Sequence, residues 1–131
     1  MNKCSERQTK IMIVDDDPYL CLALGLRLRA NHYKAFSTAD GYSALALAQK
    51  EHPDLVLLDL GLPGFATGTN VLKHMRRIPS LALIPVIVIT GRELRDYKKR
   101  VLELGAAGCF QKPFDNEELL DLIRVSLLPK A

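Results

Sequence analysis

The sequence has few cysteines, and none at a spacing typical of metal binding. It has three, Cys4, Cys21 and Cys109, and no two of them form a Cys-x-x-Cys pair. A disulfide framework needs an even set of cysteines, and a structural zinc site needs closely paired ones. The odd count therefore argues against both kinds of scaffold and favours a reducing compartment.

Long apolar runs and a one-sided charge are missing as well. No apolar run reaches the length of a signal-peptide core or a membrane span, and residues 1–10 are mostly polar. We therefore expect a soluble, cytoplasmic protein with no membrane partner. The net charge is only +3, and the basic residues are scattered without interleaved aromatics. This pattern predicts no direct nucleic-acid binding.

The overall composition is that of one globular domain. The 131 residues are 48% hydrophobic and 25% charged, enough to bury a core without covalent staples. No internal repeat, low-complexity segment or interdomain linker interrupts them. We expect a polar lead at 1–9, one domain at 10–128 and a short tail at 129–131.

Short apolar runs alternate with amphipathic stretches along this domain. Runs of four apolar residues at 11–14, 55–58 and 86–89 are rich in β-branched residues, which predicts strands buried on both faces. Weaker strands fit 33–37 and 108–110. Five such strands alternating with helices predict an α/β, doubly wound parallel sheet covered on both faces by five helices.

The helical patterns carry start and stop signals. Asp17 is placed to cap a helix that begins with Pro18, where the missing N–H has no cost. Asp115, with Glu118 three residues on, starts the last helix. Apolar spacing predicts a helix over 94–104, ended by Gly105. The two remaining helices centre on 44–48 and 71–75.

Polar residues gather directly after the predicted strands. In open parallel sheets, ligands bind outside the carboxyl ends of the strands, so these residues are the candidates for chemistry. They comprise several carboxylates, a hydroxyl and an ammonium group: Asp15, Asp16, Asp17, Asp59, Thr90 and Lys112.

Carboxylates gathered in this way either take up protons or bind a cation. Two unit charges about 4 Å apart repel by roughly 4 kcal/mol at an effective dielectric near 20. Oxygen-only ligands with room for water and phosphate favour Mg²⁺. Asp15 and Asp16 are the expected ligands, and the carbonyl of Gly61 could complete the set. Asp59, exposed by the turn after it, is the expected nucleophile for an aspartyl phosphate. The cation and Lys112 would neutralise the phosphoryl oxygens, and Thr90 would donate a hydrogen bond to another of them.

Four segments together resemble the response-regulator receiver family, over about residues 10 to 128. They are Ile-Val-Asp-Asp-Asp-Pro at 13–18, Leu-Val-Leu-Leu-Asp-Leu-Gly-Leu-Pro-Gly at 55–64, Pro-Val-Ile-Val-Ile-Thr-Gly at 85–91 and Lys-Pro-Phe at 112–114. The resemblance implies a flavodoxin-like sheet with strand order 2-1-3-4-5 and a cis Lys112–Pro113 bond. For the site it implies that Asp59 is the phosphoacceptor and that Asp15 and Asp16 bind magnesium, with the Gly61 carbonyl as a further ligand. It also implies that Thr90 is the switch hydroxyl and that Lys112 contacts the phosphoryl group.

The resemblance also implies partners. A histidine kinase or phosphotransfer protein would donate the phosphoryl group, and an output domain or partner protein would read the result. The chain would catalyse its own phosphorylation and dephosphorylation rather than act as a turnover enzyme. Dimerisation on phosphorylation is open, and so is whether the regulator stands alone or is part of a longer protein.

The sequence departs from the family pattern at three places. Cys109 stands three residues before the lysine, where the family usually has an aromatic residue, and Phe110 must point to the opposite face. This places signalling in the loop and backbone after Thr90. The loop at 64–68 is about one residue longer than usual. Gly61 and Arg92 occupy positions at which the family tunes phosphate lifetime.

Other functions remain as alternatives. A haloacid-dehalogenase-type phosphatase needs a second acid where Gly61 stands, and a flavin or nucleotide binder needs a phosphate cradle where the aspartates stand. Cys109 leaves open an interaction module that no longer uses phosphate, and a lesser role in redox sensing. The basic run 98–100 is expected to be a solvated face, with partner docking as the alternative, and the three histidines are expected at the surface.

Overall fold

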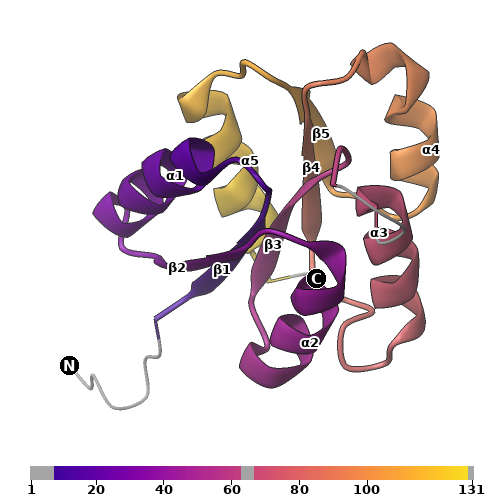
Figure 1. The fold of residues 1–131 in the computed structure, drawn as a ribbon. Helices are drawn as coiled ribbons and strands as arrows, with labels where there is room; N and C mark the ends of the chain where they lie inside the picture. The colour runs from indigo at the N-terminus through magenta and orange to yellow at the C-terminus, as the bar shows by residue number, and fades with distance from the viewer. Residues whose placement is uncertain (1–7, 63–66, 130–131) are drawn as a thin grey trace.

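The computed structural model describes residues 8–62 and 67–129, except for the side chain of Asp96 (Figure 1). Cys4, most of the polar lead, the loop residues at 63–66 and the last two residues of the tail lie outside the described residues. None of the described helices is long and apolar enough to cross a membrane.

Five parallel strands form one sheet in the order β2-β1-β3-β4-β5. Their bounds are β1 Lys10–Val14, β2 Lys34–Thr38, β3 Leu55–Asp59, β4 Val86–Thr90 and β5 Gly108–Gln111. All five lie where apolar runs predicted them, and the predicted order is confirmed. Because every strand runs the same way, their carboxyl ends meet at one edge of the sheet.

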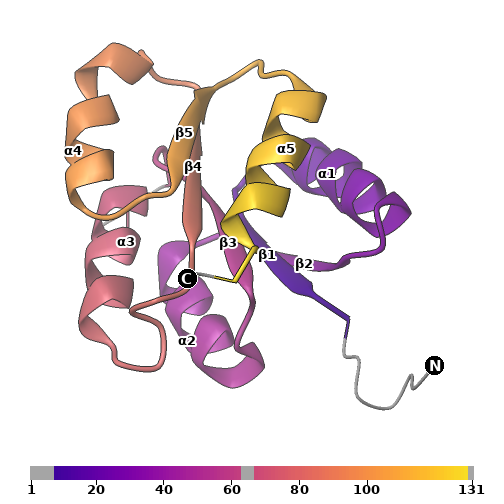
Figure 2. The same ribbon diagram turned by 180° about the vertical axis from the view of Figure 1, so that it is seen from behind.

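Helices cover both faces of this sheet. α1 (Pro18–Ala30) and α5 (Asn116–Ser126) lie on one face. α2 (Gly41–Glu51), α3 (Gly68–Arg77) and α4 (Lys98–Glu103) lie on the other. Figures 1 and 2 show these two layers from opposite sides, and the predicted doubly wound architecture is confirmed.

Alternate residues of each strand enter different halves of the core. In β1, Ile11 and Ile13 pack under α1 and α5, whereas Met12 and Val14 pack under α2 and α3. None of these four side chains is more than 1% exposed. Burial on both faces explains why the strands are continuous apolar runs rather than alternating ones.

Aspartate caps start the helices that follow β1 and β5. The Asp17 carboxylate accepts hydrogen bonds from the backbone N–H groups of Tyr19 and Leu20, with Pro18 in the first turn. Asp115 likewise accepts from two N–H groups at the start of α5. Both caps were predicted, and each fixes the direction in which the chain leaves the site edge.

The predicted helix over 94–104 is divided in two. Residues Leu94–Asp96 form a short 3-10 helix, η2, and α4 begins only at Lys98. Between them Tyr97 has φ −121° and ψ −16°, and neither start has a side-chain cap. Apolar positions three and four residues apart face the core whether or not the helix is broken, so the spacing could not reveal the break.

Candidate functional site

The three consecutive acids after β1 have three different environments. Asp15 is 2% exposed, and its carboxylate accepts hydrogen bonds from the Asp17 N–H at 2.9 Å and from Lys112 Nζ at 2.7 Å. Asp17 is committed to the cap of α1. Asp16 stays exposed. Two of the three carboxylates are therefore available to the site, as predicted.

Asp59 ends β3 beside them. Its Oδ1 accepts the Gly61 backbone N–H at 3.0 Å, and its Oδ2 lies 3.7 Å from Lys112 Nζ. The sequence predicted an exposed side chain, and this was wrong, because Asp59 is only 5% exposed. The turn after β3 brings the Gly61 N–H onto this carboxylate.

Asp15, Asp16 and Asp59 each bring one carboxylate oxygen to the same place. These three oxygens all lie within 4.8 Å of one another. Such a set suits a hard, oxygen-seeking cation that keeps part of its water shell, so the cluster is compatible with a metal site of the Mg²⁺ kind. The Gly61 carbonyl as a further ligand remains a prediction.

The charges of this cluster act on its titratable groups. Burial raises the pKa of the Asp59 carboxyl, and the charges of Asp15 and Asp16 add to that rise. The Gly61 N–H and the Lys112 ammonium oppose it. Burial alone would lower the pKa of Lys112, but the hydrogen bond to Asp15 and the charges of Asp15, Asp59 and Asp17 together outweigh burial and leave that pKa raised. Lys112 therefore remains a cation between two buried carboxylates.

Thr90 ends β4 and is completely buried. Its hydroxyl accepts the Arg92 N–H at 3.0 Å, and its carbonyl accepts the Lys112 N–H at 2.7 Å. The Lys112–Pro113 bond is cis, as predicted. The ends of β4 and β5 are thus tied together at the edge where the carboxylates lie.

Gly68 was not recognised from the sequence as a residue of the site, although it packs against the turn after Asp59. A methyl group added there would overlap the carbonyl oxygen of Asp59 and lie 2.6 Å from Leu60 Cα. The start of α3 can therefore approach the end of β3 only without a side chain. The sequence signal was a lone glycine opening an apolar-periodic stretch, which did not separate close packing from an ordinary turn.

Cys109 and Phe110 point to opposite faces of β5, as predicted. Cys109 packs with the cluster on the α4 side, and Phe110 packs with the cluster under α5. The Phe110 ring meets Phe114, with centroids 6.2 Å apart. Burial raises the pKa of the Cys109 thiol. Phe110 therefore does not replace the aromatic residue that the family usually has at position 109.

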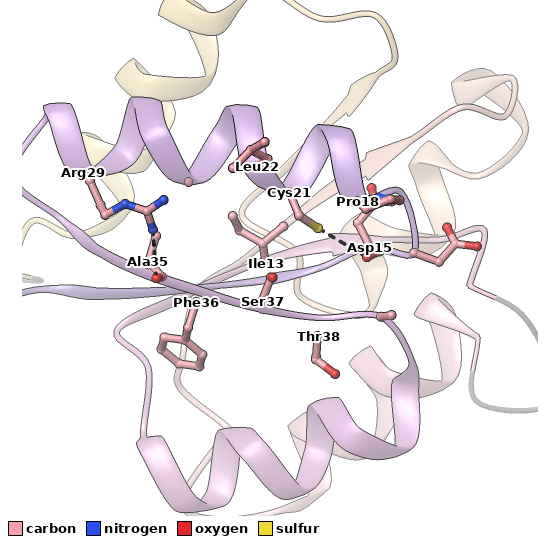
Figure 3. Close-up of a pocket in the computed structure, with 13 residues that line it drawn as sticks. Ile13, Asp15, Pro18, Cys21, Leu22, Arg29, Ala35, Phe36, Ser37 and Thr38 are labelled. Carbon is pink, nitrogen blue, oxygen red and sulfur yellow. Dashed lines mark hydrogen bonds between the residues drawn. The ribbon is translucent and has the colours of Figure 1, made fainter.

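A groove of about 540 Å³ opens beside the acids, between α1 and β2 (Figure 3). Asp15 and Asp16 lie at one end of it. Cys21 lies in its wall and donates its thiol proton to the Asp15 carbonyl. At the other end, Arg29 donates to the Ala35 carbonyl at 3.3 Å. The residues that enclose the groove thus also hold the backbone of Asp15.

The basic run and the histidines lie at the surface, away from the site. The basic run 98–100 and the side chains of His32, His52 and His74 are all exposed. The surface placement predicted for the histidines is confirmed, and the exposure of the basic run fits both a solvated face and partner docking.

Comparison with known proteins decides the family. The sequence model of the response regulator receiver domain matches residues 11–124. This chain belongs to the response-regulator receiver family. The sporulation initiation phosphotransferase F of Bacillus subtilis is 39% identical over 122 residues, which cover 93% of this chain and 96% of that protein. The sensory transduction protein RegX3 of Mycolicibacterium smegmatis is 40% identical over 91% of this chain, which spans only 50% of RegX3.

Solved structures agree with this assignment. The receiver superposes on a putative response regulator from Chloroflexus aurantiacus with a TM-score of 0.86 and 30% identity, covering 92% of this chain and 98% of the other. The chemotaxis response regulator CheY4 of Vibrio cholerae gives a TM-score of 0.83 at 29% identity, covering 92% and 100%. The chain is therefore a receiver domain of two-component signalling, and its acidic pocket fits a phosphoacceptor site.

Proposed function

We propose that Asp59 accepts a phosphoryl group from the phosphohistidine of a histidine kinase or phosphotransfer protein, or from a small acyl phosphate. The observation that carries this is the meeting of three carboxylate oxygens within 4.8 Å, with Lys112 between Asp15 and Asp59. The proposed domain extends over 10–128, and we place its reaction in the cytoplasm.

The chemistry uses the residues at the carboxyl ends of the strands. An Asp59 carboxylate oxygen attacks phosphorus, and a P–O bond forms as the P–N or P–O bond of the donor breaks. The leaving imidazole or carboxylate takes the electron pair. The Lys112 ammonium neutralises charge on the phosphoryl oxygens, and the Thr90 hydroxyl donates a hydrogen bond to one of them. Later attack by water releases inorganic phosphate and restores the carboxylate, so the domain modifies itself rather than turning over a separate substrate.

Asp15, Asp16 and Asp59, with the Gly61 carbonyl, would hold Mg²⁺ in this reaction. The bound ion supplies positive charge against the phosphoryl oxygens. The residues present fit such an ion, because among the described residues the buried carboxylates of Asp15 and Asp59 share one cationic partner, Lys112.

The outer face of α1 supports docking of a donor protein next to Asp59. Tyr19, Leu22 and Leu26 follow one another at helical spacing and are 82%, 59% and 60% exposed. The opposite face of α1 is buried in the core, so this helix is apolar on both sides. An apolar stripe of this kind on a helix beside the site is a contact surface for a partner.

Phosphorylation then changes the charge that the site presents. The single negative charge of Asp59 is replaced by a group of about −2, which draws Thr90 and Lys112 inward and biases a surface read by an output domain or partner. The names of the relatives, one a phosphotransferase and others sensory transduction proteins, are in keeping with such a role.

The test is intact-mass spectrometry of the protein incubated with Mg²⁺ and acetyl phosphate. We expect the added mass of one phosphoryl group, abolished by EDTA and by Asp59→Asn. Asp121→Asn, which removes an exposed carboxylate on α5, is the matched control and should be labelled like the wild type. No added mass on the wild type, when a known receiver is labelled in parallel, would refute the proposal and favour a phosphate-independent interaction module.

A further inference from the structure

The segment after β4 connects the Thr90 hydroxyl to a partly buried tyrosine. The backbone N–H of Arg92 donates to Thr90 Oγ1 at 3.0 Å. The side chain of the same arginine donates from Nη1 to the Tyr97 hydroxyl at 3.2 Å. Arg92 thus contacts the site through its backbone N–H and the start of α4 through its side chain.

The contact between Arg92 and Tyr97 has two parts. Besides the hydrogen bond, the guanidinium carbon lies 5.7 Å from the centroid of the Tyr97 ring. A cation over an aromatic face and a hydrogen bond to its hydroxyl together hold the ring more firmly than either alone. Tyr97 in turn packs against the core cluster that Cys109 also meets.

The segment that carries Tyr97 has uncapped helix starts, which favours movement. Tyr97 lies at the break between η2 and α4, and neither helix start has a side-chain cap. A hydrogen bond from the Leu94 N–H to Gln111 Oε1 on β5 also holds this segment, and the Tyr97 N–H donates to the Leu94 carbonyl at 3.0 Å. The two uncapped helix starts in this segment are thus the places where a movement that begins at Thr90 can be taken up.

We propose that Arg92 and Tyr97 form a latch that transmits the state of Thr90 to the start of α4. Arg92 is a positioning residue in this arrangement, and the inference rests on the proposed function. When the Thr90 hydroxyl turns toward a phosphoryl group on Asp59, it gives up the Arg92 N–H. Without the hydrogen bond from its N–H to Thr90, Arg92 shifts and its side chain no longer bonds to Tyr97. The Tyr97 ring then leaves its place on the core cluster. The aromatic side chain that moves on phosphorylation is thus Tyr97 at the start of α4, and not a residue of β5, where Cys109 stands.

The latch is tested by ¹⁹F NMR of the full chain labelled with 3-fluorotyrosine. The chain has four tyrosines, and Tyr97→Phe assigns the resonance in question. On incubation with Mg²⁺ and acetyl phosphate, the Tyr97 resonance should move by more than its linewidth, while that of the exposed Tyr42 on α2 stays in place. Intact mass of the same sample reports how much protein is phosphorylated.

Two outcomes separate the latch from the proposed function. Added phosphoryl mass with an unmoved Tyr97 resonance would overturn the latch alone. Absence of added mass would overturn the proposed function and the latch with it. These readings use the unsubstituted residues of the site and so do not depend on a variant that fails to fold.

A substitution at Arg92 gives the second measurement. In Arg92→Ala the Tyr97 resonance of the unphosphorylated protein should already be displaced, and most of its movement on phosphorylation should be lost. Arg95→Ala removes an exposed arginine from the same segment and should keep the wild-type movement. An Arg92→Ala protein whose Tyr97 resonance matches the wild type in both states would exclude Arg92 from the latch.

Discussion

Lys112 bonds to Asp15 more closely than to Asp59, although Lys112 and Asp15 lie 97 residues apart in the sequence. Nζ is 2.7 Å from the Asp15 carboxylate and 3.7 Å from that of Asp59. The lysine comes from the end of β5 and Asp15 from the end of β1, on opposite sides of β3. Only the parallel arrangement of strands brings one cation to both acids.

Removal of this cation should slow phosphorylation. We expect Lys112→Ala to lower the initial rate with acetyl phosphate by about 10²–10³-fold, the usual effect of deleting one donor to a developing anion. Lys98→Ala, which removes an exposed lysine, should react at the wild-type rate. The check is the rate of phosphoryl mass gain under identical Mg²⁺. A Lys112→Ala rate close to that of Lys98→Ala would show that Lys112 has no part in the transfer.

Asp59 should make the magnesium-free protein less stable at neutral pH than its amide variant. Its pKa is raised in the fold, first by burial and then by neighbouring carboxylates. The stability linked to Asp59 is thus fully present below the unfolded pKa, about 4, and is lost as the pH rises through the higher folded pKa. Asp59→Asn escapes this loss.

Thermal unfolding in EDTA from pH 4 to 8 measures this effect. The Tm of Asp59→Asn should exceed that of the wild type at pH 7, and the difference should shrink as the pH falls toward 4. A difference that does not depend on pH would mean that the charge of Asp59 is not its cause. Mg²⁺ should raise the Tm of the wild type more than that of Asp59→Asn, because a ligand stabilises the state that binds it.

Gly68→Ala should be destabilising and should disturb the phosphoacceptor turn. The added methyl group overlaps the Asp59 carbonyl, so α3 or the turn must move, at a cost of about 3 kcal/mol. Gly91→Ala is the matched control, since a methyl group there meets no heavy atom within 4 Å. Urea unfolding of both variants decides the matter, and equal midpoints would contradict the close approach of α3 to β3.

Arg76 should stabilise the fold more than an arginine on a helix surface usually does. Its guanidinium donates to the carbonyls of Ala82, Ile84 and Gly105, at 3.0, 2.9 and 3.1 Å. Arg76→Ala should lower the free energy of unfolding by about 2–3 kcal/mol, because it leaves partly buried carbonyls without their donor. The neighbouring Arg77 is exposed, and Arg77→Ala should cost less than about 0.5 kcal/mol. Similar losses for both would disprove this bridging role.

Much of the fold was predictable because its signals are local. Runs of four β-branched and apolar residues marked strands buried on both faces, and Asp17 with Pro18 marked the start of α1. The carboxyl ends of parallel strands share one edge, so the meeting of Asp15, Asp16 and Asp59 followed from strand direction alone.

The rest depends on contacts that the sequence does not contain. Asp59 is buried and accepts a hydrogen bond from the turn that follows it, and the need for Gly68 arises from the approach of two backbones. The break at Tyr97 left the apolar spacing unchanged and so gave no warning. Which acid Lys112 prefers is set by distances of about an ångström, well below what spacing along a chain can specify.

If Asp59 itself carries the phosphoryl group, as we propose, the modification can be located at that residue. Borohydride reduces an aspartyl phosphate to homoserine, which tandem mass spectrometry then assigns within a peptide. After treatment with Mg²⁺ and acetyl phosphate, we predict homoserine at position 59 alone, and none when EDTA is present. Homoserine at Asp15 or Asp16, or phosphate on a hydroxyl or histidine side chain with Asp59 unchanged, would contradict the account.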